Sequence, residues 1–330
     1  MKVAIVILNW NGRELLQKFL PAVVLHSAEA DIYVADNASS DDSIAFISEN
    51  FPSVRIIRNR ENFGFALGYN EALKSVDADI FALLNSDVLV TENWLDPIIA
   101  EFKCDQQISI IQPKIKDYKN RELFEYAGAA GGFIDKYGYA FCRGRIFESI
   151  ETDHGQYDDN CTIFWATGAC MFVRKEVFAS LNGFDADFFA HQEEIDFCWR
   201  AYNVGMKARY VAQSVVYHVG GATLNVSHPR KTFLNFRNSL LMLHKNLPGE
   251  NLYAILFVRL ILDGIAGVRF LFQGKPRHMA AVIQAHFSFY RLFSSNHLKR
   301  HQSQKGDYFA VNSIVKNYFL RKISKYNKLF

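Results

Sequence analysis

The sequence contains few cysteines and no pairing pattern among them. Its 330 residues include five, an odd number without a Cys-x-x-Cys spacing, which argues against a disulfide framework and against a zinc site. The sequence also has no G-x-x-x-x-G-K-[ST] phosphate loop, no G-x-G-x-x-G pattern, no internal repeat and no low-complexity segment. These absences argue against P-loop and dinucleotide-dependent enzymes. We expect the thiols to be reduced packing residues.

The first residues lack the features of a secretory signal peptide. A charged segment, a long apolar core and a small-residue cleavage site are all missing before the strand-like run at residues 3–8. We therefore expect a cytoplasmic protein.

Acidic residues are scarce in the last third of the chain. Residues 230–330 contain 17 Lys and Arg but 3 Asp and Glu, whereas residues 1–229 contain 20 and 31. Such a basic segment is expected to meet an anionic surface, either a membrane or a nucleic acid. A content of 50% hydrophobic residues allows a full core, so we expect a globular domain at 1–225 and a helical, basic extension at 226–330.

Short apolar runs alternate with helical patterns in the first part of the chain. The runs are 3–8, 32–35, 54–57 and 80–84, and the helical patterns are 14–25, 43–49 and 67–75. This alternation predicts an α/β fold with a mostly parallel, doubly wound sheet. Farther along we expect loops and a hairpin at 112–159, one buried strand at 161–173, helices at 175–181, 193–202 and 231–245, and a last strand at 208–217.

Polar side chains stand where three of the apolar runs end. Asn9, Asp36 and Asn85 directly follow their runs, and Asp87 comes two residues after Asn85. Ligands of such sheets bind outside the carboxyl ends of the strands, so we expect a nucleotide site at this rim. The alternative for Asp36 is ordinary turn and helix-cap chemistry with residues 37–42.

Asp87 and His218 are candidate ligands of a divalent cation. Asp87 can supply a hard oxygen at the end of an apolar strand, and His218 ends another strand, where neutral imidazole can complete the metal shell. The alternatives are a helix N-cap for Asp87 and a structural role for His218.

Glu193 and Glu194 form an acidic pair between apolar segments, at the start of a predicted helix. Burial and a neighbouring carboxylate raise a carboxyl pKa toward neutrality, which suits a general base that removes a proton from an alcohol. The alternative is a solvated acidic helix start. Farther upstream, Asn62 and Gly64 open a helix with small residues that let backbone approach a ligand closely.

Residues 252–272 are almost wholly apolar. The three charges, Arg259, Asp263 and Arg269, fall within an arc of roughly 120° at helical spacing. The wide apolar face fits either a helix in the bilayer interface or a helix packed on the core. Basic residues near the chain end, such as Lys316 and Arg321, favour an anionic membrane surface.

Seven motifs in this order resemble one enzyme family. They are Val6-Ile7-Leu8-Asn9-Trp10-Asn11-Gly12, Val34-Ala35-Asp36-Asn37-Ala38-Ser39, Asn62-Phe63-Gly64-Phe65, Leu83-Leu84-Asn85-Ser86-Asp87, Trp165-Ala166-Thr167-Gly168-Ala169-Cys170, Phe188-Phe189-Ala190-His191-Gln192-Glu193-Glu194-Ile195-Asp196 and Phe236-Arg237-Asn238. Over residues 1 to about 245 the chain resembles glycosyltransferase family 2, especially its bacterial rhamnosyltransferase-like branch. The resemblance implies an A-type glycosyltransferase fold, a nucleoside-diphosphate sugar donor, Mg²⁺ or Mn²⁺, and inversion at the anomeric carbon.

The resemblance also implies roles for individual residues. Asp36 would contact the base, Asp87 the metal and diphosphate, and the segment near Gly168 the donor sugar or the acceptor. The second residue of the Glu193-Glu194 pair would be the base. The remaining donor-site candidates are Asn9, Asn62, Gly64 and Asn85.

The sequence departs from the commoner family pattern at two positions. Asn85 replaces an Asp, which removes one anionic ligand. Glu194 replaces an Asp and reaches one methylene further, so that Glu193 is the alternative base.

The function expected from the resemblance is sugar transfer to a hydroxyl of a lipid-linked bacterial surface glycan. The donor would be deoxythymidine-diphosphate-rhamnose or a uridine-diphosphate sugar. We expect a peripheral enzyme that uses its C-terminal region to hold the anionic inner face of the cell membrane, and not a nucleic acid. The alternative is a catalytically weak nucleotide-sugar-binding scaffold, and the sequence makes no prediction of oligomeric state.

Overall fold

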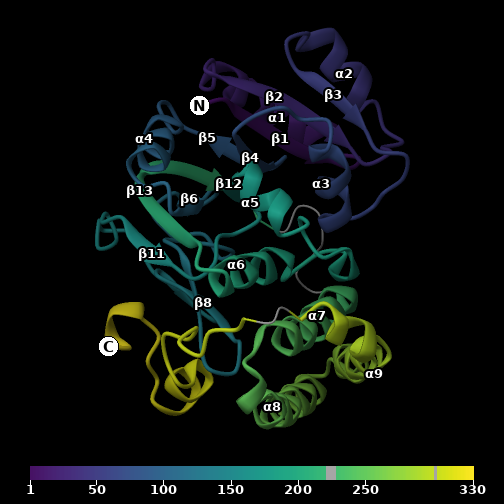
Figure 1. Cartoon of the computed structure of the whole chain (residues 1–330), viewed down its shortest axis with the longest axis vertical. Helices are drawn as coiled ribbons and strands as arrows, with labels where there is room; N and C mark the ends of the chain where they lie inside the picture. Colours follow the sequence, from purple (N-terminus) through teal and green to yellow (C-terminus); the bar gives the residue numbers. More distant parts are fainter. Residues whose placement is uncertain (221–227, 301–302) are drawn as a thin grey trace.

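The structure is a computed structural model that describes residues 1–220, 228–300 and 303–330. The predicted boundary between 225 and 226 lies outside the described residues, so the division into two domains remains a prediction. In Figure 1 the central sheet occupies the upper part of the molecule and the C-terminal helices the lower part.

Nine strands form the central sheet within the described residues. They are β1 (Val3–Asn9), β2 (Ala30–Asp36), β3 (Arg55–Arg58), β4 (Ile80–Asn85), β5 (Val88–Val90), β6 (Ile108–Asp117), β11 (Cys161–Ile163), β12 (Cys170–Arg174) and β13 (Lys207–His218). The order is β11-β13-β6-β12-β4-β1-β2-β3, with β5 paired to β13. The ladders β3-β2-β1-β4 and β6-β13 are parallel, and β12 runs antiparallel between β4 and β6. The predicted mostly parallel sheet is confirmed.

Both faces of the sheet are buried, because side chains alternate along each strand. In β1, Ala4 and Val6 join one core cluster, while Ile5 and Ile7 join the other. The helices of this part are α1 (Arg13–Leu25), α2 (Ser43–Asn50), α3 (Ala66–Leu73), α4 (Asp96–Cys104), α5 (Lys175–Ser180) and α6 (Glu193–Asn203), with a short turn of 3₁₀-helix, η1 (Ala186–Phe188). Helix α1 packs on the face of Ile5, and α3 on the face of Ala4. The elements predicted for residues 3–84 agree with the structure to within two residues.

The prediction of one buried strand at 161–173 is wrong. The chain forms β11 at the sheet edge, where it pairs with β13, and β12 between β4 and β6. The connecting residues 164–169 cross from the edge to the centre of the sheet. Phe164 and Trp165 in this connection are buried in the core, so the apolar run continues through a segment that is not a strand.

The prediction of loops and a hairpin for 112–159 is also incomplete. Strand β6 continues to Asp117, and a second, antiparallel sheet follows, made of β7 (Gly132–Ile134), β8 (Ala140–Cys142), β9 (Arg145–Ile146) and β10 (Ser149–Ile150). The buried part of β6 contains Gln112 and Lys114. Gln112 bonds to the loop at Thr167, and Lys114 pairs with Asp153. These polar residues interrupt the apolar pattern by which buried strands are recognised.

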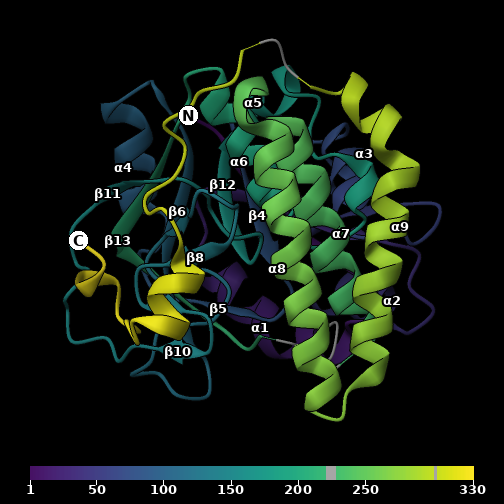
Figure 2. The same cartoon turned by 90° about the horizontal axis from the view of Figure 1, so that it is seen from below.

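Three long helices form the lower part of the molecule. They are α7 (Pro229–Asn246), α8 (Leu252–Phe272) and α9 (Pro276–Leu298), accompanied by the short η2 (Gly249–Asn251), η3 (Lys316–Leu320) and η4 (Tyr326–Lys328). Helix α7 packs on α6, α8 and α9. Figure 2 shows α8 and α9 side by side. Among the described residues, no helix combines the length and apolar character needed to cross a membrane.

Candidate active site

His218 lies between two carboxylates at the edge of the sheet. Its Nε2 is 3.1 Å from Oδ1 of Asp87, and its Nδ1 is 3.2 Å from Oε1 of Glu125. All three side chains are buried. The contact arises because Val88 of β5 is paired with His218 of β13, which brings the residue before β5 to the end of β13. The structure thus brings Asp87 and His218 together, as the sequence predicts.

The spacing of Asp87 and His218 fits one divalent cation. Neighbouring ligands at about 2.1 Å from an octahedral ion are about 3.0 Å apart, close to the 3.1 Å between Nε2 and Oδ1. Glu125 lies beside the far nitrogen, Nδ1, which makes no hydrogen bond among the described residues, so this contact is electrostatic. Within the described parts of the chain no three His, Cys, Asp or Glu side chains form a metal-binding group. A cation held by Asp87 and His218 would take its other ligands from phosphate oxygens and water.

The carboxylates also hold a proton on His218. Burial lowers the pKa of His218, but Glu125 and Asp87 outweigh that effect and raise it to about 10. A cation at this nitrogen would replace the proton, since imidazole binds metals in its neutral form.

Glu193 and Glu194 begin α6, and each has a buried carboxylate oxygen. Glu193 is 4% exposed, and Glu194 is partly exposed. One carboxylate oxygen of each, Oε2, is buried without a hydrogen-bond partner among the described residues. Burial raises the pKa of Glu194 to about 7. Burial and the adjacent Glu194 raise the pKa of Glu193 well above its usual range. A solvated acidic helix start does not describe this pair.

The loop before α6 has a strained backbone. Phe189, His191 and Gln192 all have positive φ angles, of 62°, 71° and 73°, which non-glycine residues adopt at a cost of about 1–3 kcal/mol each. Asn238 of α7 holds this loop, since its Nδ2 is within 3.0 Å of three backbone oxygens, those of Phe188, Ala190 and His191. Strain that the surrounding structure maintains is typical of functional sites.

Lys231 of α7 is partly buried. Burial lowers the pKa of Lys231, and the charge of Glu125 partly opposes that change. Burial and the charge of Lys231 together lower the pKa of His191 to about 4.

Contacts between neighbouring segments connect the predicted donor residues to the loop before α6. The amide of Asn85 donates to the carbonyl of Ala169 at 3.0 Å, and a side chain at Gly168 would approach the ring of Phe65 to 2.9 Å. The amide of Phe65 donates to the carbonyl of Phe189 at 2.8 Å. The end of β4, the start of β12 and the loop before Glu193 are thus linked by successive contacts.

Buried polar side chains meet at the ends of β1 and β2. Asn9 Nδ2 donates to Asp36 Oδ1 at 3.1 Å, and the other oxygen of Asp36 accepts from the amide of Ser39. Asn9 Oδ1 is buried without a hydrogen-bond partner among the described residues. A Cβ at Gly12 would lie 2.4 Å from that oxygen, so glycine is required for Asn9 to keep this position.

Asn62 and Gly64 form the turn that leads into α3. Asn62 Oδ1 accepts from the amide of Gly64 at 3.0 Å, and the Gly64 carbonyl accepts from Asn37 Nδ2 at 2.8 Å. Gly64 has a φ of 71°, and a Cβ there would come within 2.7 Å of Phe189. The small residues thus let this turn contact the loop before α6.

Sequence reasoning missed Glu125, Lys231 and the positioning role of Asn238. Asn238 belongs to the motif Phe236-Arg237-Asn238, so a signal for it was present. Glu125 lies in the irregular segment between β6 and β7, where no periodicity indicates that it faces His218. Nothing in the sequence near Lys231 predicts that burial lowers its pKa.

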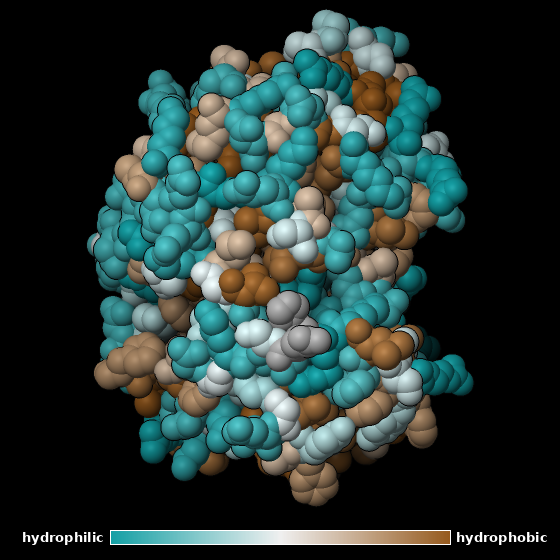
Figure 3. Space-filling model, viewed as in Figure 1, coloured by the Kyte–Doolittle hydropathy of each residue, from teal (hydrophilic) through white to brown (hydrophobic). Residues whose placement is uncertain are grey.

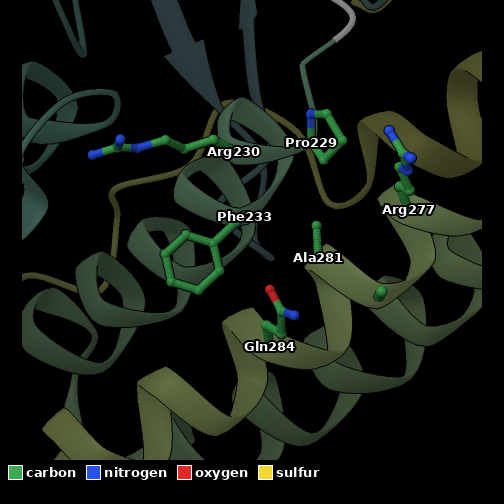
Figure 4. A pocket seen from close by; sticks show the side chains of 7 residues that line it. Pro229, Arg230, Phe233, Arg277, Ala281 and Gln284 are labelled. Atoms are coloured by element: carbon green, nitrogen blue, oxygen red, sulfur yellow. The ribbon is translucent and has the colours of Figure 1, made fainter.

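A groove lies between α7 and α9 (Figure 4). It has a volume of about 510 Å³ and is lined by Pro229, Arg230, Phe233, Arg277, Ala280, Ala281 and Gln284. In Figure 4, Phe233 from α7 and Gln284 from α9 lie near each other, Arg277 lies on the right, and the side chain of Arg230 extends to the left, away from the other labelled residues. The guanidinium of Arg230 lies 5.2 Å from the ring centre of Phe189, in the loop before α6. The groove therefore adjoins the segment that carries Glu193 and Glu194.

Comparison with known proteins identifies the family. The family model described as "Glycosyl transferase family 2" matches residues 4–181. A low-salt glycan biosynthesis hexosyltransferase, Agl10, of Haloferax volcanii is 22% identical over 85% of this chain and 88% of its own length. An N-acetylglucosaminyl-diphospho-decaprenol L-rhamnosyltransferase of Mycobacterium tuberculosis is 22% identical over 62% of this chain and 71% of its own length.

A solved structure confirms the fold expected from the sequence. The mannosyltransferase PcManGT from Pyrobaculum calidifontis, in complex with GDP-Man and Mn²⁺, superposes with a TM-score of 0.53 at 15% identity, and the match covers 88% of this chain and 87% of that one. The architecture is that of the A-type glycosyltransferases.

Proposed function

This chain belongs to glycosyl transferase family 2 and is a glycosyltransferase, and we propose that it transfers a sugar from a nucleoside-diphosphate donor to a hydroxyl of a lipid-linked glycan, with inversion at the anomeric carbon. We place the reaction at the cytoplasmic face of the membrane. The observation that carries the proposal is the series of contacts through Ala169, Phe65 and Phe189 that connects the segment before Asp87 to the loop before Glu193. Asp87 with His218 suits a cation on a diphosphate, and Glu193 with Glu194 suits a base.

The donor would lie along the carboxyl ends of the strands. Asp36 and Asn9 would receive the base and ribose, and the free Oδ1 of Asn9 is an acceptor for a ligand donor group. Asn85 and the turn of Asn62 and Gly64 would border the sugar and diphosphate. Asp87 and His218 would hold Mg²⁺ or Mn²⁺, which neutralises charge on the diphosphate when bound.

The transfer would be a single displacement. Glu194 takes the proton of the acceptor hydroxyl, whose oxygen forms a bond to the anomeric carbon. The bond from that carbon to the diphosphate oxygen breaks, and the electron pair leaves with the nucleoside diphosphate. Attack opposite the leaving group inverts the anomeric centre. A pKa near 7 leaves a useful fraction of Glu194 ionised at neutral pH, and Glu193 is the alternative base.

The acceptor is proposed to enter through the groove between α7 and α9. Arg230 and Arg277 provide positive charge for an acceptor diphosphate, and Phe233, Ala280 and Ala281 provide apolar surface for the adjoining lipid. The mycobacterial relative is named for a diphospho-decaprenol acceptor and for rhamnose, which supports a polyprenyl-diphosphate acceptor and deoxythymidine-diphosphate-rhamnose as the first donor to test, ahead of uridine-diphosphate sugars.

A panel of donors tests the proposal. The purified full chain would be assayed with deoxythymidine-diphosphate-rhamnose and with uridine- and guanosine-diphosphate hexoses, each with Mn²⁺ or Mg²⁺ and with polyprenyl-diphosphate-linked N-acetylglucosamine. We expect one donor to raise the melting temperature and to give a glycosylated lipid of inverted configuration by NMR. Absence of transfer with every donor would contradict the proposal.

A second candidate function rests on Asn85. An amide in place of a carboxylate removes one anionic metal ligand, as expected of a catalytically weak scaffold that binds nucleotide sugars for a glycan assembly complex. Donor binding without hydrolysis or transfer in the same panel would favour the scaffold.

A further inference from the structure

Helix α8 turns its central charges toward the protein. Arg259 and Asp263 are 4% and 0% exposed, and Arg259 Nε donates to Asp263 Oδ1 at 2.8 Å. Arg259 also donates to the carbonyl of Tyr137 at 3.0 Å, and Tyr139 donates to Asp263 at 3.3 Å. His286 of α9 faces the same carboxylate at 3.6 Å. The ion pair therefore anchors α8 to the second sheet and to α9.

The outward side of α8 is apolar over its whole length. Its exposed large side chains recur at intervals of three or four residues, and their exposed fractions range from 45% for Val268 to 88% for Phe272. They are Tyr253, Phe257, Ile261, Ile265, Val268, Leu271 and Phe272. Helix α9 adds Ile283, Phe287 and Tyr290, also exposed. We call these ten residues the apolar face.

The two helices present the apolar face as one broad surface. They lie in contact and side by side in Figure 2, and Figure 1 shows them at the end of the molecule away from the central sheet. In Figure 3 apolar side chains lie along the lower margin, where Figure 1 places α8. A contiguous exposed surface of this kind marks an interaction site on a folded protein.

Positive charge borders the apolar face, and exposed negative charge is missing from its two helices. The one acidic residue in 252–298 is Asp263, which is buried. Arg269, Lys275 and Arg291 are exposed. The guanidinium of Arg269 lies 5.1 Å from the ring centre of Phe319, which places the basic C-terminal segment containing Lys316 beside the end of α8.

We propose that the apolar face inserts into the interface of an anionic lipid bilayer, with α8 and α9 parallel to the membrane plane. A helix with apolar residues on one side and cations at the margin binds in this manner, with the apolar side about 5–10 Å deep. Arg269, Lys275 and the C-terminal lysines would contact anionic headgroups. The proposal goes beyond sugar transfer, because binding to a bilayer requires neither donor nor turnover.

A second copy of the chain fits this face less well. A two-fold contact would place the same surface against itself, and the basic margins of both copies would then approach each other. An anionic bilayer instead supplies the opposite charge. It also accounts for the groove, because Arg277 and Gln284 of the groove lie on α9, so that a lipid-linked acceptor could reach it from the membrane.

Vesicle flotation of the full chain tests the proposal. Vesicles would contain phosphatidylcholine alone or with about one third phosphatidylglycerol. We expect wild type to float with the anionic vesicles, and Phe257→Asp/Ile265→Asp to reduce the partition coefficient at least ~10-fold, because two large apolar side chains would carry charge in the interface. Arg269→Gln/Lys275→Gln should lower the partition coefficient about fivefold for each cation removed. It should also reduce the dependence of binding on phosphatidylglycerol.

Leu25→Asp is the matched control, since Leu25 is an exposed apolar residue of α1 in the sheet region. It should float as wild type does. Circular dichroism and donor hydrolysis in solution would show that the variants are folded. If wild type does not float, if Phe257→Asp/Ile265→Asp floats equally well, or if sedimentation shows a dimer that this variant abolishes without any vesicle binding, the proposal is overturned. Flotation without turnover with any donor would instead contradict the proposed function.

Discussion

His218 Nε2 and Asp87 Oδ1 lie 3.1 Å apart, although 130 residues separate them in the sequence. The contact depends on the pairing of β5 with β13, and Oε1 of Glu125 lies 3.2 Å from the far ring nitrogen. We predict that Asp87→Asn weakens Mn²⁺-dependent nucleotide binding at least ~10-fold, because an anionic ligand is lost. Isothermal titration with Mn²⁺ and nucleotide measures this effect.

Asp77→Asn serves as the control for this titration, since Asp77 is an exposed carboxylate at the opposite end of β4. Its affinity should equal that of wild type. Unchanged affinity in Asp87→Asn would remove Asp87 from the metal site.

The pH dependence of transfer should follow the buried glutamate pair. Burial raises the pKa of Glu194 to about 7, and a general base acts in its ionised form. We therefore expect kcat/KM to rise as pH increases through about 7 and to reach a plateau above it. A profile already flat from pH ~5 upward would show a base of ordinary carboxyl pKa and would contradict this assignment.

Removing the side chain of Asn238 should affect the loop before α6. Asn238 Nδ2 faces three carbonyl oxygens of that loop, and the positive φ angles at His191 and Gln192 require external support. We predict that Asn238→Ala lowers kcat by about 10-fold to 100-fold and changes donor affinity little. The split between kcat and the donor dissociation constant distinguishes misplacement of the base from general destabilisation.

Asn235→Ala on the same helix controls for the loss of an amide from α7. It should keep kcat within about twofold of wild type. Equal losses of kcat in both variants would show that α7 as a whole, and not the Asn238 contacts, determines turnover.

Arg230 in the groove should affect KM for the acceptor and not KM for the donor. We predict that Arg230→Ala raises KM for a polyprenyl-diphosphate acceptor about 10-fold, the loss expected for a charge-assisted contact with phosphate. Its KM for the donor should not change. Arg291→Ala removes an exposed arginine of α9 outside the groove lining and is the control. Steady-state kinetics with each substrate varied in turn would contradict the groove as acceptor site if both KM values stayed constant.

The sequence predicted those strands and helices in which the apolar pattern continues without interruption. Residues such as Ile5 and Val34 lie in runs buried on both faces, so their strands were identified. Polar residues that directly follow such runs, including Asn9 and Asp36, could be placed at one rim because parallel strands end there. The continuation of β6 to Asp117 could not be predicted. Gln112 and Lys114 interrupt its apolar pattern, because they bond to residues in distant loops.

Contacts between distant segments account for most of what the sequence did not show. Glu125 reaches His218 through a loop without periodicity, and Asn238 meets the loop before α6 because α7 packs on α6. For α8 the sequence placed the three charges on one arc, but it could not decide which side of the helix faced the protein. The buried ion pair of Arg259 and Asp263 shows the charged side facing inward.

The most direct test of the central claim, that the Asp87 site and the glutamate pair serve one transfer reaction, is turnover of Glu194→Gln and Glu193→Gln alongside their donor affinity. We predict that one of the two variants loses about 10²-fold or more in kcat while it binds the metal–nucleotide donor as wild type does. Near-normal turnover in both variants would contradict the account.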